Sequence, residues 1–287
     1  MPTPFYHLSV ALELLEHANL AVPARDMLLV QRSAFLFGNT ATDVQVVSKQ
    51  AREDTHFFTL PIQKDVPPPW ELILTTHPAL AKPARMTGEH AAFMAGYLCH
   101  LQADWLWIDE LFLPVFGPDA NWTTFSQRLY LHNVLRSYLD RQVMAALPPG
   151  IAGELELASP RGWLPFVEDK HLREWRDYIS GQLAPGAAAQ TVEVFAARQG
   201  IPVQEFYRLL ESEGQMDREI FSHLPRSSLI EYRRRLISMN VSLLNVTYNP
   251  VSAITVRSER SKDRNIHWNH KKSHSGRMDL DRQHRPY

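Results

Sequence analysis

Apolar residues recur every three or four positions through most of residues 8–244, a spacing that places them on one face of a helix. The pattern predicts helices over residues 8–17, 24–37, 70–77, 89–113, 123–146, 167–183, 187–198, 203–213 and 227–244. It fails between residues 37 and 70, where Pro61 and the run Pro67-Pro68-Pro69 predict a long irregular connection. Only residues 246–256 resemble a strand. We therefore expect an all-α protein with one main core.

Charge is distributed unevenly along the chain. Residues 257–287 hold nine Lys or Arg, four Asp or Glu and four His, with few large apolar side chains. Such a segment buries too little apolar surface to offset its ordering entropy. We therefore expect a disordered basic tail over residues 257–287, after a helical domain of residues 1–256. The histidines of this tail could also bind metal ions loosely; they are His267, His270, His274 and His284.

Composition narrows the class of protein further. With 45% apolar residues, a chain of 287 residues can bury a full core. Its 30 basic and 31 acidic residues argue against a globally basic nucleic-acid binder. The single cysteine, Cys99, excludes an internal disulfide framework and a Cys-rich zinc module. The sequence has no apolar run of ~18 residues and no secretory signal at its start, so we expect a cytoplasmic protein.

The strongest local signal for chemistry is His100-x-x-x-Asp104, within the predicted helix over residues 89–113. Positions i and i+4 share one helix face, so this imidazole and this carboxylate can bind one ion. Apolar residues cover much of the circumference of the same helix, and a buried Asp needs a partner. Taken alone, such a pair is more often a hydrogen-bonded couple in a protein core.

Three other residues could complete a metal site with this pair, because such sites gather ligands from several elements. His7 lies just ahead of the first predicted helix, and Asp43 lies in a turn after the second. His56 stands before Phe57 in the irregular connection. Each of the three would, alone, be interpreted as a capping or surface group.

Taken in this order on an all-α chain, His7, Asp43, His56 and His100-x-x-x-Asp104 resemble the zinc-dependent phospholipase C family. That family shares its zinc site with the fungal single-strand nucleases. The resemblance covers about residues 1–140 and is most specific in residues 38–44, 55–57 and 96–104. It implies a multi-helical zinc phospholipase C-like domain.

The resemblance also implies the ligands and the chemistry. His7 and Asp104 would hold one zinc, and Asp43, His56, His100 and the shared Asp104 would hold a second. Zinc lowers the pKa of a bound water towards ~7, and the resulting nucleophile would attack phosphorus in line. Asp43 would accept the proton of that water, as the family's turn aspartate is expected to do.

The ligands of the family's third zinc are matched less well in this sequence. The family places another His further along the helix, where this chain has Glu110, and later a His-x-x-x-Glu pair, where it has His132 and Arg136. Glu110 and His132 remain candidate ligands, although Glu110 lies roughly 80° round a straight helix from His100. Arg136 could instead replace the cation and bind phosphate oxygens of the substrate. The alternative for Arg136 is an ion pair with Asp140.

Three functions follow from these residues. The first is a zinc-dependent phosphodiesterase of phospholipase C type, for which the resemblance implies a phosphoester substrate such as a phospholipid headgroup ester. The second is a nuclease with the same zinc chemistry, which the mildly acidic balance of residues 1–256 disfavours because polyanion binding requires a basic groove. The third is a helical scaffold that keeps one structural zinc, an alternative suggested by the altered third site.

Overall fold

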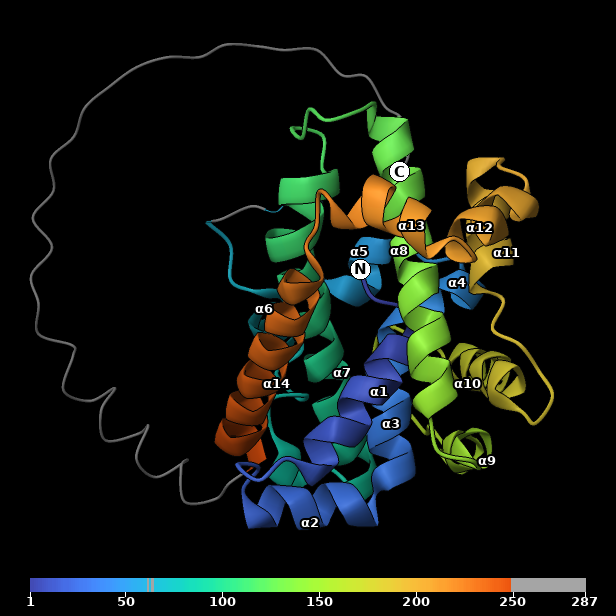
Figure 1. The fold of residues 1–287 in the computed structure, drawn as a ribbon. Helices are drawn as coiled ribbons and strands as arrows, with labels where there is room; N and C mark the ends of the chain where they lie inside the picture. The colour runs from blue at the N-terminus through green and yellow to red at the C-terminus, as the bar shows by residue number, and fades with distance from the viewer. Residues whose placement is uncertain (61, 63–64, 249–287) are drawn as a thin grey trace, which may run out of the picture. The chain divides into compact units, whose positions relative to one another are not determined.

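The computed structural model describes residues 1–60, 62 and 65–248, and every regular element within them is a helix. The all-α fold class is thereby confirmed for this part of the chain (Figure 1). The longer helices are α1 (Pro4–Glu16), α2 (Val22–Val30), α3 (Arg32–Ala41), α6 (Pro69–Thr76), α7 (Gly88–Trp107), α8 (Phe125–Ala146), α10 (Asp169–Leu183), α11 (Thr191–Gln199), α12 (Val203–Leu210) and α14 (Arg226–Tyr248).

Shorter helical elements connect these helices. They are η1 (Thr42–Val44), α4 (Gln45–Ser48), α5 (Arg52–His56), η2 (Pro83–Arg85), α9 (Ile151–Glu156) and α13 (Glu213–Met216), with π-helical turns at η3 (Ile108–Phe116) and η4 (Asp217–Phe221). No helix in the described ranges combines the length and the hydrophobicity needed to cross a bilayer.

Two predicted segments fold differently from the sequence pattern. Residues 24–37 form two helices, α2 and α3, because the chain leaves the helical conformation at Gln31. This break lets α3 turn inward and bury its consecutive apolar residues on all sides. The connection predicted as irregular contains η1, α4 and α5, and residues 151–156 form the unpredicted α9. Helices of three to six residues are too short to show a helical period in sequence.

Other differences lie at helix ends, and η2, α13 and η4 were also not predicted. The helix predicted over residues 89–113 is α-helical only to Trp107 and then continues as the π-helical η3. Val246–Tyr248, predicted to begin a strand, are instead the last turn of α14. The rest of that predicted strand, the domain boundary at residue 256 and the predicted tail over residues 257–287 lie outside the described residues.

Helix α7 is buried around nearly its whole circumference, with α1, α3 and α14 packed against it (Figure 1). Its contact with α3 is a backbone contact at two glycines. A Cβ on Gly38 would overlap the carbonyl oxygen of Phe93. A Cβ on Gly96 would overlap the carbonyl oxygen of Phe35 and lie 2.7 Å from the backbone nitrogen of Asn39. This close crossing brings the end of α3 against the middle of α7.

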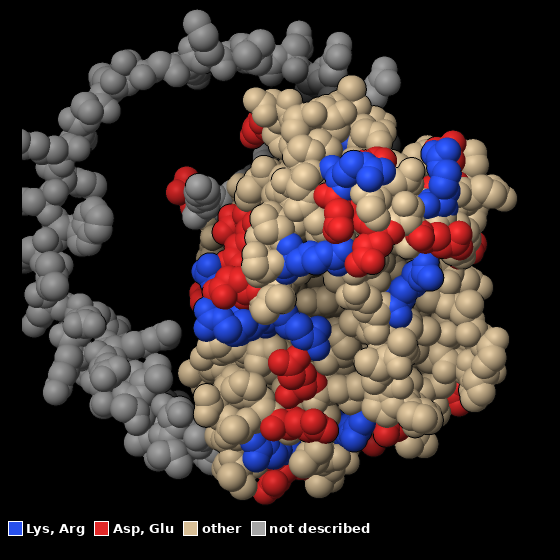
Figure 2. Space-filling model, in the orientation of Figure 1, with Lys and Arg blue, Asp and Glu red and all other residues tan. Residues whose placement is uncertain are grey.

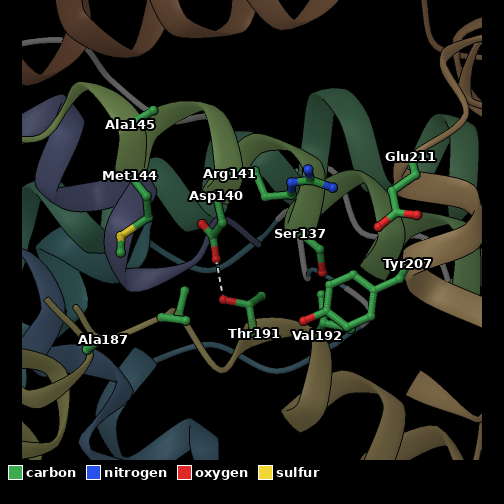
Figure 3. A pocket seen from close by; sticks show the side chains of 12 residues that line it. Ser137, Asp140, Arg141, Met144, Ala145, Ala187, Thr191, Val192, Tyr207 and Glu211 are labelled. Atoms are coloured by element: carbon green, nitrogen blue, oxygen red, sulfur yellow. Dashed lines mark hydrogen bonds between the residues drawn. The ribbon is translucent and has the colours of Figure 1, made fainter. Parts of the chain in front are cut away.

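Asp140 on α8 fixes the start of α1. Thr3 caps α1, and its hydroxyl also donates a hydrogen bond to Oδ1 of Asp140. Oδ2 of the same carboxyl accepts a hydrogen bond from Thr191 at the start of α11, beside a cavity of about 540 Å³ that Asp140 lines (Figure 3). One buried carboxyl group thus ties together α1, α8 and α11, and it holds α1 one turn before His7.

Burial of Asp140 makes the stability of the protein depend on pH. Burial raises the pKa of this carboxyl group to about 7, although the two threonine hydroxyls and Arg136 act against the shift. The folded protein therefore binds this proton more tightly than the unfolded chain, and the contribution to stability falls as pH rises from about 4 to about 7. The free energy of unfolding of Asp140→Asn, taken relative to that of the wild type, should therefore rise by about 3 kcal/mol between pH 5 and pH 8. Urea unfolding of both proteins at the two pH values measures this change. If the two proteins differed in stability by the same amount at both pH values, Asp140 would not be protonated in the folded protein at pH 5.

Candidate metal centre

Five of the predicted ligands meet at one place, although they come from four elements. His7 lies in the first turn of α1, Asp43 in η1 and His56 at the end of α5, while His100 and Asp104 lie one turn apart on α7. Their ligand atoms form two groups, His7–His100–Asp104 and Asp43–His56–His100. Within each group, all ligand atoms lie within 4.8 Å of one another. These buried His and Asp groups could hold a metal ion.

The two oxygens of Asp104 face different histidines. Oδ1 lies 3.4 Å from Nε2 of His7, whereas Oδ2 lies 3.3 Å from Nε2 of His56 and 3.7 Å from Nε2 of His100. On the other side of His56, Oδ1 of Asp43 lies 3.5 Å from the same Nε2. His100 belongs to both groups, and the two oxygens of Asp104 also face histidines of both.

Among the residues that the structure describes, four ligand atoms at this place are buried without a hydrogen-bond partner. They are Nε2 of His7, Nε2 of His56, Nε2 of His100 and Oδ1 of Asp104. Buried polar atoms in folded proteins almost always have a partner, and leaving one without costs about 1–3 kcal/mol. Unpartnered donor atoms of this kind, gathered in two adjoining groups, are what the ligand set of a metal ion requires.

Backbone carbonyls orient two of the histidines. Nδ1 of His100 lies 2.8 Å from the carbonyl oxygen of Asn39, at the end of α3. Nδ1 of His56 lies 3.2 Å from the carbonyl oxygen of Arg52 and 3.0 Å from the hydroxyl of Thr55. A carbonyl can only accept, so each Nδ1 carries a proton, and in the neutral imidazole Nε2 then presents a lone pair to the centre. Histidine ligands in metal sites are commonly oriented in this way.

The charges of the centre suit metal binding. Burial, together with the neighbouring His100, lowers the pKa of His7 to about 4. Burial would also lower the pKa of His100, but the Asp104 and Asp43 carboxylates outweigh it and raise that pKa. Burial would raise the pKa of Asp104, yet the adjacent histidines hold it well below its usual range, and the pKa of Asp43 is lowered in the same way. Both carboxylates are thus ionised, as metal ligands must be.

Two contributors to the centre were not among the predicted residues. Arg52 places its Nη2 2.9 Å from Oδ2 of Asp104, and Asn39 orients His100 as described above. Arg52 precedes His56 by four residues, and Asn39 precedes Asp43 by four. For Arg52, this one-turn spacing before a ligand is a signal that could have identified it, whereas Asn39 acts through its backbone carbonyl, which no residue type marks.

The structure places Glu110 and His132 outside both groups. Glu110 lies on the π-helical η3 and forms an ion pair with Arg235 of α14. Nε2 of His132 accepts a hydrogen bond of 2.9 Å from the indole nitrogen of Trp107, and burial lowers the pKa of His132 well below its usual value. Both side chains thus have protein partners that do not belong to the metal groups.

Arg136 lies inside the fold and does not form the alternative ion pair with Asp140. Its Nη1 donates to Oδ1 of Asn133 at 3.0 Å, and its guanidinium lies 4.2 Å from the ring centroid of Phe195. Burial lowers its pKa to about 10 despite the Asp43, Asp140 and Asp104 carboxylates. Asp140 binds threonine hydroxyls instead.

Comparison of this chain with family models, with curated proteins and with solved structures found no match. The geometry of the centre is therefore the basis on which a function is assigned to it.

Proposed function

We propose that the protein is a zinc-dependent phosphodiesterase that binds two zinc ions at this centre. The observation that carries the proposal is the convergence of four buried, unpartnered ligand atoms around Asp104. A purely structural carboxylate–histidine cluster would use those atoms in hydrogen bonds.

The spacing of the ligand atoms is suitable for zinc. Neighbouring ligands of a tetrahedral zinc, with bonds of about 2.1 Å, lie about 3.4 Å apart. Four histidine–carboxylate atom pairs of this centre lie between 3.3 and 3.7 Å apart. Because its two oxygens face different histidines, Asp104 would bridge the ions. One zinc would be held by His7 and Asp104, and the other by Asp43, His56, His100 and Asp104.

When bound, the zinc ions would polarise a phosphoryl oxygen and lower the pKa of water at the site towards ~7. Residues of the chain would carry out the proton transfer. Asp43 is ionised, and its side chain is 19% exposed, so its carboxylate can accept the proton of an attacking water. Asp104 is only 2% exposed and serves as a ligand rather than as a base. The water oxygen would bond to phosphorus as the P–O bond to the leaving group breaks, and the leaving oxygen would take up the proton that Asp43 had accepted.

Surface charge favours a small phosphoester or a lipid headgroup over nucleic acid. Basic and acidic side chains are interspersed on the face drawn in Figure 2, without a broad basic groove. On α14, arginines pair with acidic neighbours, including Arg226 with Asp217 and Arg233 with Glu13. A nuclease requires unpaired basic groups along the phosphate backbone.

Zinc removal tests the proposal. The full chain, dialysed to strip weakly held zinc from the tail histidines, should contain two zinc ions. A stronger chelator should abolish hydrolysis of bis(p-nitrophenyl) phosphate and lower the free energy of unfolding by about 4 kcal/mol if zinc stood near a thousand times its Kd. Added zinc should restore both. One retained zinc without hydrolysis would support the scaffold instead, and no zinc at all would exclude the metalloenzyme.

A comparison of substrates then distinguishes the two hydrolases. A phosphocholine ester should be hydrolysed faster than single-stranded DNA by the same zinc-loaded protein. The reverse preference would support the nuclease.

A further inference from the structure

Within the described part of the chain, the candidate ligands differ in how far their side chains reach solvent. The side chains of His56, His100 and Asp104 are between 0 and 2% exposed, and that of His7 is 1% exposed. In contrast, Asp43 is 19% exposed and Arg52 is 22% exposed. A substrate that reaches the centre must therefore approach past these two residues.

Arg52 is held in place at this opening. Its Nη2 lies 2.9 Å from Oδ2 of Asp104, and its guanidinium lies 4.5 Å from the ring centroid of Phe58. Phe58 in turn packs edge-on against Trp105, with ring centroids 5.6 Å apart. A guanidinium that rests on an aromatic ring loses less freedom when it forms a further hydrogen bond.

Within the described part of the chain, most hydrogen-bond donors of this guanidinium have no acceptor. Its contacts with acceptor atoms of the protein, Oδ2 of Asp104 and Sδ of Met1, are both made by Nη2. Nε of Arg52 is buried and has no hydrogen-bond partner. Arginine offers five donors in a planar fork that matches two oxygens of a phosphate group, so donors remain for such a ligand.

The balance of charge calls for an anion at the same place. Asp43 and Asp104 contribute two negative charges, and Arg52 contributes one positive charge. Two divalent ions would leave the centre with a clear excess of positive charge, which an anionic ligand would compensate. This step rests on the proposed function.

We propose that Arg52 binds the phosphoryl group of the substrate at the open side of the centre. Its unused donors would bind phosphoryl oxygens while Asp104 and Phe58 hold its position. The backbone of the same residue already orients His56 through its carbonyl group. A side-chain substitution leaves that carbonyl in place, so the two roles of Arg52 can be separated.

Binding of inorganic phosphate to the zinc-loaded protein tests this proposal by calorimetry, independently of turnover. Arg52→Gln should keep two zinc ions and weaken phosphate binding by about ten- to a hundredfold, the range for a charge-assisted hydrogen bond. Arg52→Lys, which keeps the charge but loses the planar fork, should recover part of the affinity. Arg32→Gln is the matched control, because Arg32 also pairs with a carboxylate, Glu154, and should leave phosphate binding unchanged.

The outcomes that overturn the proposal are distinct. Unchanged phosphate affinity in Arg52→Gln would mean that Arg52 only neutralises Asp104. Loss of zinc from the same variant would assign Arg52 to holding the ligand set. A wild-type protein that binds no zinc would overturn the proposed function itself, and this role of Arg52 with it.

Discussion

Replacement of Asp104 by asparagine should remove zinc and hydrolysis together. Asp104 is the one residue whose oxygens face His7 on one side and His56 and His100 on the other. An amide cannot bridge two cations, so the zinc content should fall from two ions to fewer than one per chain. Hydrolysis of a diester should fall by about a thousandfold or more, which corresponds to ~4 kcal/mol of transition-state stabilisation.

Asp109→Asn is the matched control for this substitution. Asp109 is exposed in η3 and belongs to neither metal group, so the same chemical change should leave zinc content and hydrolysis unaltered. Elemental analysis and the diester assay give both readings, and circular dichroism verifies that each variant is folded. An Asp104→Asn protein that keeps two zinc ions would refute the bridging role.

Gly96→Ala should destabilise the protein by forcing α3 and α7 apart. The new Cβ would overlap the carbonyl oxygen of Phe35 and crowd Asn39 at 2.7 Å, so α3 and α7 would have to separate. A backbone offers no flexible end that could move aside, and we expect a loss of about 3 kcal/mol in the free energy of unfolding. Because Asn39 orients His100, zinc affinity should fall as well.

Gly181→Ala provides the comparison for that experiment. Gly181 lies within α10, is exposed, and has no atom within 4 Å of an added Cβ. Alanine should therefore stabilise the protein there by about 0.5–1 kcal/mol, through the higher helix propensity alone. Equal stabilities for the two variants, measured by urea unfolding, would show that the helices do not cross in backbone contact.

The long helices were predictable because a helix buried on one face has apolar residues at every third or fourth position of its sequence. This holds for α8 and α10, which begin within two residues of their predicted starts. The division of residues 24–37 was not predictable, since neither Gly nor Pro marks Gln31. What bends the chain there is the burial of α3 against α7, a long-range contact that a local pattern does not contain.

The clustering of these possible metal ligands was predictable from residue types and order rather than from distances. His100 and Asp104 share a helix face, but His7, Asp43 and His56 come together with them only through the tertiary fold. The third-site residues show the limit of such reasoning. A straight helix already turned Glu110 away from His100, and the π-helical η3 changes the direction of that side chain again, towards Arg235. Nothing in the sequence marks where an α-helix becomes a π-helix.

The crossing of α3 and α7 is formed by a short sequence motif that occurs twice. Each glycine lies three residues after a phenylalanine, in Phe35-Leu36-Phe37-Gly38 and in Phe93-Met94-Ala95-Gly96, and each glycine touches the carbonyl group of the other segment's phenylalanine. The backbone contact is therefore reciprocal between the two copies of the motif. Paired Phe-x-x-Gly segments, the first followed by an aspartate and the second by His-x-x-x-Asp, therefore form a search pattern. Distant chains that carry it should have the same helix crossing, even where overall similarity is no longer detectable.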